Sequence, residues 1–196
     1  MAQVTLLTRG YMHRLSGGVI HASPSVTLIK DSGINVLVDP GANAKILVEA
    51  LFREGLTPDK IDLVFLTHYH PDHVLNIRLF PDKDILDVNN IYRGDLEIPY
   101  EDSIPGTEIE VVPTPGHAPE HAALLVDTDQ GRCLVAGDLF WWPDDAVQKT
   151  DHRSLIDLED EFAFDHVVLA ESRQRSLEMA DYVIPGHGKP FVVNLP

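Results

Sequence analysis

Cysteine, positive charge and long hydrophobic segments are all scarce in this sequence, and each shortage excludes a class of protein. The single cysteine, Cys133, rules out an intrachain disulfide, and we expect it to be a small buried residue of a strand. No apolar run approaches the roughly 20 residues that span a bilayer, and the first ten residues lack the features of a signal peptide. The sequence therefore predicts a cytoplasmic protein without a membrane partner.

Positive charge is the second shortage, because 15 lysine and arginine residues face 31 aspartate and glutamate residues, and the formal net charge is −16. A surface this acidic repels phosphates. The densest cationic group is Arg173-Gln174-Arg175. The composition therefore counts against nucleic acid as the substrate, although bound metal ions would add local positive charge.

The rest of the composition is that of an ordinary globular protein, and the 196 residues suit one domain, residues 1–196. Hydrophobic periodicity predicts two strand-rich stretches, each followed by helix. We therefore expect an α+β fold of two packed sheets with helices outside. The expected strands are 4–7, 26–29, 34–38, 61–66, 85–88, 90–92, 108–112, 122–126, 133–136 and 183–184. The expected helices are 44–53 and, in one or two pieces, most of 153–181, and 9–23 is expected to be a flexible loop.

The hexapeptide His68-Tyr69-His70-Pro71-Asp72-His73 holds the densest group of metal ligands in the chain. It follows a buried strand and precedes a short helix, with Pro71 in the first turn. Residues 68 and 70 lie on the same side of an extended segment, so they can share one ion. Asp72 and His73 can then face a second ion.

Three later segments each combine a strand, a glycine and a ligand. They end in Gly116-His117, Gly137-Asp138 and Gly186-His187. Glycine permits a sharp turn and a close approach of the backbone at a strand end. Seven donors result, which exceed the three or four protein ligands of one zinc ion. We therefore expect two divalent ions with one bridging carboxylate, zinc first, and iron or manganese as alternatives.

These motifs resemble those of the metallo-β-lactamase superfamily over nearly the whole chain. The resemblance rests on residues 68–73, Pro115-Gly116-His117, Gly137-Asp138, Pro185-Gly186-His187-Gly188 and the early segment Leu37-Val38-Asp39-Pro40-Gly41. Within the superfamily the sequence is most similar to a small single-domain branch called "metallo-β-lactamase domain-containing". The resemblance implies a four-layer αββα sandwich. It assigns His68, His70 and His117 to one metal, Asp72, His73 and His187 to the other, and Asp138 to a bridge.

The implied activity is hydrolysis of a small-molecule ester, thioester or lactone by a hydroxide that bridges the two ions. Asp72 and Asp138 are the candidate catalytic residues, with Asp72 orienting the hydroxide and receiving its proton. Asp138 stands where many true β-lactamases of this fold use cysteine, and His70 stands where the oxygen-reducing diiron branch has glutamate. A nuclease with Arg173 or Arg175 as contacts, an oxygenase with one iron, and a non-catalytic scaffold are the alternatives.

Other polar and aromatic residues have roles that the sequence leaves open. Asp39 and Thr67 are candidates for holding ligand histidines in the correct tautomer. His121 either supports the site or starts a strand. His13 and His21 belong to the expected loop, and Trp141 and Trp142 line a substrate pocket or pack in the core. The sequence does not fix the oligomeric state, and a homodimer is compatible with it.

Overall fold

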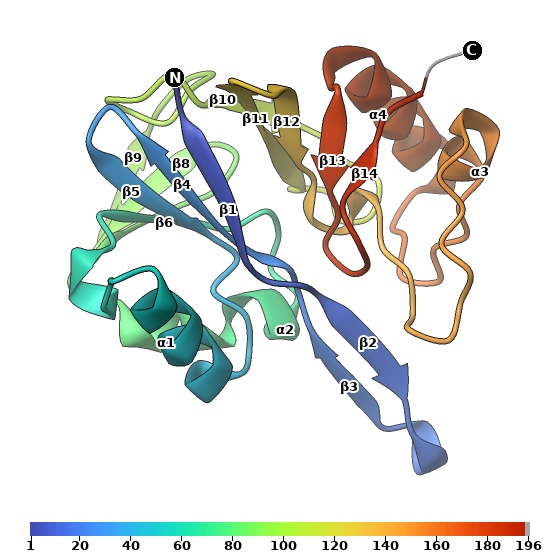
Figure 1. Ribbon diagram of the computed structural model, residues 1–196, viewed down its shortest axis with the longest axis horizontal. Helices are drawn as coiled ribbons and strands as arrows, with labels where there is room; N and C mark the ends of the chain where they lie inside the picture. The colour runs from blue at the N-terminus through green and yellow to red at the C-terminus, as the bar shows by residue number, and fades with distance from the viewer. Residues whose placement is uncertain (195–196) are drawn as a thin grey trace.

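The alternation of side chains in the central strands divides the apolar residues between two sides of each sheet. In the strand Ala122–Thr128, Leu124 and Val126 belong to one buried cluster, whereas Ala123 and Leu125 belong to another. A strand that is apolar on both faces needs cover on both faces. In the computed structural model, which describes residues 1–194, each sheet accordingly has the other sheet on one face and helices on the opposite face (Figure 1).

Two sheets form the inner layers among the described residues. The first has the order β1-β4-β5-β6-β7-β8-β9 and the second has the order β10-β11-β12-β13-β14. The strands of the first are β1 (Gln3–Thr8), β4 (Val26–Asp31), β5 (Ile34–Val38), β6 (Leu63–Phe65), β7 (Asp84–Leu86), β8 (Asn90–Arg93) and β9 (Leu96–Pro99); those of the second are β10 (Glu110–Pro113), β11 (Ala122–Thr128), β12 (Gly131–Val135), β13 (Tyr182–Ile184) and β14 (Phe191–Val192).

Helices cover the outer faces. Helix α1 (Ala44–Arg53) packs on the first sheet through Leu47, Ala50 and Leu51, and α4 (His166–Met179) packs on the second through Leu169 and Leu177. The shorter helices are α2 (Pro71–Val74) and α3 (His152–Ile156), and the 3-10 turns are η1 (Ser16–Gly18), η2 (Pro58–Lys60), η3 (Leu75–Leu79) and η4 (Gly137–Leu139). The expected αββα sandwich is therefore confirmed.

Helix α1 has the bounds that its sequence predicts, because both of its ends carry local signals. The Asn43 side chain accepts a hydrogen bond from the backbone N–H of Ile46 at 3.2 Å, which caps the first turn. Gly55, with φ of 71°, follows the last turn. No helix among residues 1–194 is both long and apolar enough to cross a bilayer.

Two sequence-based expectations were wrong or incomplete. Residues 9–23 are not a flexible loop, because β2 (Tyr11–Arg14) pairs with β3 (Ile20–Ser23) in an antiparallel hairpin that projects from the sandwich (Figure 1). Strands β9 and β14 were not expected, because they have only four and two residues, too few for alternation to identify a strand. The expectation of helix over most of 153–181 is confirmed in two pieces, α3 and α4, which residues 157–165 separate.

The strand directions decide where the site forms. Strands β5 and β6 are parallel, and so are β12 and β13. The carboxyl ends of parallel neighbours meet at the same edge of a sheet. The segments that follow β5, β6, β12 and β13 carry Asp39, His68, Asp138 and His187 respectively, so these residues gather at one rim of the sandwich.

Candidate metal centre

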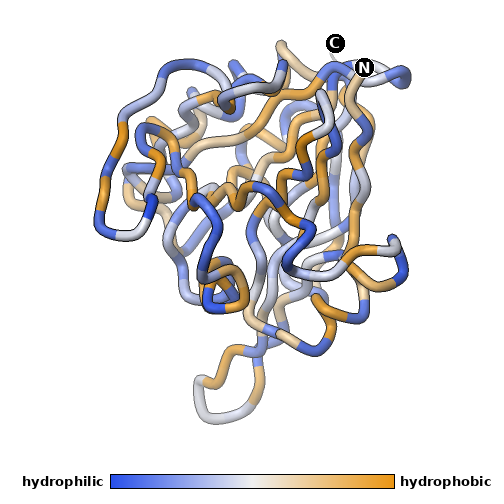
Figure 2. Tube along the Cα trace, turned by 90° about the vertical axis from the view of Figure 1, so that its left-hand side faces the viewer, coloured by the Kyte–Doolittle hydropathy of each residue, from blue (hydrophilic) through white to orange (hydrophobic). Residues whose placement is uncertain are grey.

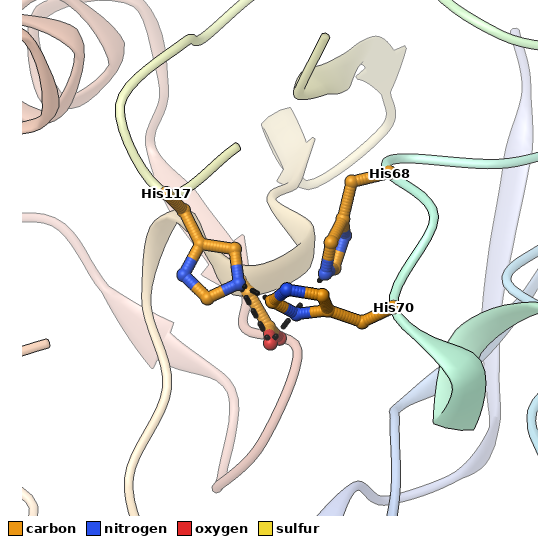
Figure 3. A group of neighbouring side chains, drawn as sticks. His68, His70 and His117 are labelled. Atoms are coloured by element: carbon orange, nitrogen blue, oxygen red, sulfur yellow. Dashed lines mark hydrogen bonds and ion pairs between the residues drawn. The ribbon is translucent and has the colours of Figure 1, made fainter. Parts of the chain in front are cut away.

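The first group of candidate ligands consists of His68, His70, His117 and Asp138, whose donor atoms all lie within 4.8 Å of one another. Figure 3 shows the rings of the three histidines converging from two separate segments of the chain. Nε2 of His117 lies 3.5 Å from Oδ2 of Asp138, and Nε2 of His68 lies 3.8 Å from the same oxygen. This arrangement has the donor types and the size of a site for one ion.

The second group consists of Asp72, His73 and His187, whose donor atoms also lie within 4.8 Å of one another. Oδ1 of Asp138 lies 3.3 Å from Nε2 of His73 and 3.5 Å from Nε2 of His187. The two oxygens of Asp138 therefore face different groups, as a bridging carboxylate requires. The structure brings all seven predicted residues together in the predicted grouping; that they bind metal stays a prediction.

Buried polar atoms without partners support a metal at this place. Among the described residues, Nε2 of His68, Nε2 of His73 and Oδ1 of Asp138 are buried without a hydrogen bond. Burying such atoms unpaired is costly, and native proteins avoid it. All three point into the cluster that the seven residues enclose, so the donor set fits two divalent ions with nitrogen and oxygen ligands.

Two glycines allow Asp138 to sit at the centre of the cluster. A Cβ atom at Gly186 would lie 1.9 Å from Oδ1 of Asp138, and a Cβ atom at Gly137 would lie 2.6 Å from Oγ1 of Thr67. Gly137 also has a φ of 50°, which other residues rarely adopt. Any side chain at either position would displace the residues around the Asp138 carboxylate, which agrees with the close approach expected from the strand-glycine-ligand pattern.

Asp39 and Thr67 hold two of the histidines, as the sequence suggested. Oδ2 of Asp39 lies 2.8 Å from Nδ1 of His73 and also accepts a hydrogen bond from the Thr67 hydroxyl at 2.8 Å. That hydroxyl lies 3.0 Å from Nδ1 of His68. These contacts leave Nε2 of both rings directed at the cluster. Asp39 adopts a φ of 49°, a conformation that aspartate tolerates when its side chain bonds locally.

Asp160 has a similar role that sequence reasoning missed. It lies between α3 and α4, is 2% exposed, and places Oδ2 2.7 Å from Nδ1 of His117. Burial would raise the pKa of Asp160, but the hydrogen bond with His117 holds the pKa below its ordinary value. The Asp160 carboxylate therefore orients the His117 ring. Nothing in the local sequence signals this, because Asp160 belongs to an acidic stretch of otherwise exposed residues.

We expect Asp160→Asn to lower the metal affinity of the first ligand group by about 10- to 100-fold, the usual loss when an outer partner of a ligand histidine is removed. The amide keeps the shape but lacks the charge that favours the correct tautomer of His117. Chelator competition measures the affinity, with Glu159→Gln on the same segment as the control. An unchanged affinity would show that Asp160 has only a structural role.

The electrostatics of the cluster depend on burial and on four carboxylates. Burial lowers the pKa of His68 well below its ordinary value, which keeps the ring neutral, as a metal ligand must be. Burial would raise the pKa of Asp138, yet in the metal-free cluster the positive charges of protonated His73 and His187 hold that pKa well below its ordinary value. Asp39, Asp72, Asp138 and Asp160 together carry four negative charges, equal to the charge of two divalent cations.

The remaining candidates separate into three kinds. His121 is fully buried, bonds to Thr114 through Nδ1, and has a pKa that burial lowers to about 3, so it packs beneath the site. Trp141 lines the cleft beside the site, whereas Trp142 packs in the core of the second sheet. His13 and His21 lie opposite each other on the projecting hairpin and are exposed, on the side away from the cleft residues.

Arg173 does not have the exposure that a nucleic-acid contact requires. Its side chain is 2% exposed, and it donates hydrogen bonds to the backbone carbonyls of Leu139 at 2.9 Å and Leu158 at 2.5 Å. Arg175 is exposed on the same helix. The structure thus removes one of the two cations on which the nuclease interpretation relied.

Comparison with known proteins agrees with the motifs. The Metallo-beta-lactamase superfamily profile matches residues 21–88. Metallo-beta-lactamase domain-containing protein 1 of Xenopus laevis is 35% identical over 200 residues, which cover 97% of this chain and 81% of that protein. A metallo-beta-lactamase-type protein of Thermotoga maritima has a TM-score of 0.72 at 20% identity, with 97% of this chain and 99% of that chain covered.

Two further solved structures share the fold and contain different metals. AidC, a dizinc quorum-quenching lactonase in complex with a product, has a TM-score of 0.65 at 16% identity, with 86% of this chain and 73% of that chain covered. The chemotaxis sensor ODP, solved with a peroxy diiron species, has a TM-score of 0.66 at 21% identity, with 97% and 85% covered. At such identities the likeness establishes the fold alone.

Proposed function

Because the chain belongs to the metallo-beta-lactamase superfamily, we propose that it is a dinuclear metal-dependent hydrolase that cleaves a small ester, thioester or lactone. The observation that carries the proposal is the placement of Asp138, whose two oxygens face the two ligand groups at 3.3 to 3.8 Å. A bridging carboxylate between two complete ligand groups is the arrangement that a two-metal hydrolase needs.

Two divalent ions held there would polarise a carbonyl oxygen and lower the pKa of a bound water to about 7. The residues of the chain supply the rest. Oδ2 of Asp72 lies 3.4 Å from Nε2 of His187, and the Asp72 side chain is 25% exposed toward the cleft. Asp72 is therefore placed to orient an attacking water and to receive its proton. Trp141 and Phe162 line the wall of the cleft beside Asp72.

Zinc is the metal that we propose first. Five imidazoles and two carboxylates suit zinc, and they also suit iron and manganese. The dizinc lactonase and the diiron sensor show that this fold accommodates both elements in other proteins. Metal content therefore has to be measured on protein purified without added metal.

The test combines metal analysis with a substrate panel. We expect about two metal ions per chain and hydrolysis of at least one ester, thioester or lactone. Absence of metal after gentle purification, or turnover limited to phosphodiesters with binding that weakens steeply with salt, would contradict the proposal and favour a scaffold or a nuclease. A single iron per chain would favour the oxygenase alternative.

A further inference from the structure

A cleft with a volume of about 430 Å³ opens beside the metal centre. Four of the residues that line it, His70, Asp72, Asp138 and His187, belong to the ligand groups. The others are apolar: Met12, Ile20, Ala22, Ala42, Pro71, Leu75, Trp141 and Phe162. The volume is at the small end of the range for ligand pockets, about 300–1,000 Å³. The candidate metal ligands thus form the bottom of the cleft, and apolar side chains form its walls.

The projecting hairpin supplies one of these walls. Met12 pairs with Ala22 across β2 and β3, and Ile20 pairs with Arg14. Residues at alternate positions of a strand share a face, so Met12, Ile20 and Ala22 point to the same side. His13 and His21 lie on the other side. Figure 2 shows apolar residues along this hairpin, which hangs below the body of the molecule.

The walls of the cleft contain no side chain that would pair with an anionic group of a substrate. No lysine or arginine is among the residues that line it within the described chain. Arg14 shares this face of the hairpin opposite Ile20, but it is not among the residues that line the cleft, and its guanidinium forms an ion pair with Glu161. The walls therefore offer no positive charge to a ligand that extends away from the metal centre.

Several wall residues are exposed although they are large and apolar. Ile20 is 48% exposed, Leu75 is 55% exposed and Phe162 is 43% exposed. These apolar side chains surround the reactive groups at the bottom of the cleft. A ligand that covers them removes apolar surface from water, which favours binding. A charged acyl group in the same place would lose its hydration without gaining a partner.

We infer that this cleft receives the acyl side of a neutral, apolar ester, thioester or lactone and excludes substrates whose acyl group carries a carboxylate or a phosphate. This inference rests on the hydrolase function proposed above and adds the class of substrate. Ile20 lies at the exposed edge of the hairpin wall. Replacing it with a cationic residue is therefore the simplest way to reverse the preference for neutral over anionic acyl groups.

The first test measures binding without turnover on the metal-loaded protein. Butyrophenone and 4-oxo-4-phenylbutanoate have the same skeleton, but the second ends in a carboxylate, and neither can be hydrolysed. Quenching of Trp141 fluorescence reports occupancy of the cleft. We expect the neutral ketone to bind at least about 20-fold more tightly, since the carboxylate has no cation to meet. Equal binding, or binding of neither ketone, would overturn the inference.

Ile20→Lys should reverse the preference, because it places an ammonium at the wall where the carboxylate ends. We expect the ratio of the two affinities to change by at least about tenfold in favour of the anion. Val19→Lys adds the same charge at the neighbouring exposed position outside the cleft and should leave the ratio unchanged. If both variants change the affinity ratio equally, the effect comes from the added net charge and not from a position on the cleft wall, and the inference fails.

Turnover of phenyl butyrate and of phenyl hydrogen succinate then separates the two proposals. Faster hydrolysis of phenyl butyrate, with the same response to Ile20→Lys, supports both. If the ketones discriminate as expected but neither ester is cleaved, the cleft assignment stands and the hydrolase proposal fails. Preferred cleavage of the succinate ester by the wild-type protein would refute the substrate class while supporting the hydrolase.

Discussion

Asp138→Ala is expected to reduce the bound metal from about two ions per chain to fewer than one, and to lower kcat/KM well beyond the 10- to 100-fold typical of an outer-shell residue. Each Asp138 oxygen faces one ligand group, at 3.5 and 3.8 Å from His117 and His68 and at 3.3 and 3.5 Å from His73 and His187. Removing the side chain therefore takes a donor from both groups at once.

Metal analysis after dialysis and hydrolysis of a reactive neutral ester measure these effects. Asp145→Ala is the matched control, because Asp145 is an exposed aspartate seven residues further along the chain. Circular dichroism of both variants establishes that the fold is retained. Retention of two ions and wild-type turnover in Asp138→Ala would disprove the bridging role and, with it, the main support for a dinuclear hydrolase.

Arg173→Met is expected to lower the free energy of unfolding by about 3 kcal/mol. The guanidinium donates to the carbonyls of Leu139 and Leu158, lies 5.9 Å from the centre of the Phe140 ring, and is 2% exposed. Each buried carbonyl left without a partner costs about 1–3 kcal/mol. Burial lowers the pKa of Arg173 to about 10, so some of this loss is offset by relief of the buried charge.

The same variant should also weaken the metal centre. Leu139 directly follows Asp138, and Leu158 precedes Asp160 by two residues, so Arg173 connects the two segments that hold these carboxylates. Urea unfolding of the metal-free protein measures the stability, and chelator competition measures the affinity. Arg175→Met on the exposed side of the same helix should change stability by less than about 0.5 kcal/mol. If Arg173→Met and Arg175→Met have the same free energy of unfolding, Arg173 does not hold the segments of Leu139 and Leu158 together.

The seven candidate ligands could be predicted from the sequence because they are metal-binding residue types in tight local patterns. A strand places the residues after it at the rim, and the spacing within residues 68–73 sends neighbouring side chains to opposite sides. The same local reasoning found Asp39, which directly follows β5, and Thr67, two residues beyond β6, and these contact His73 and His68. Short-range geometry identifies the candidate residues, whereas the full assignment to two ions came from the family resemblance.

Asp160, Arg173 and the hairpin wall could not be found in the same way. Asp160 reaches His117 across 43 residues of chain, and Arg173 reaches Leu139 across 34. In the sequence Asp160 looks like part of a solvated acidic run, and Arg173 looks like part of a surface cationic pair. The glycines of residues 9–23 suggested a flexible loop, although cross-strand pairing makes the segment a hairpin.

By itself the sequence determined two packed sheets with helices outside and the seven candidate ligands, since periodicity and local spacing depend on neighbours along the chain. The resemblance to the metallo-β-lactamase superfamily implied the αββα order and the full grouping of the ligands. Only the tertiary structure decided which carboxylates surround the candidate ligands, which arginine is buried, and that the cleft beside them has apolar walls without a cation among the described residues that line it. These properties arise from contacts between segments far apart in the chain, where burial and pairing, and not residue type, determine what a side chain does.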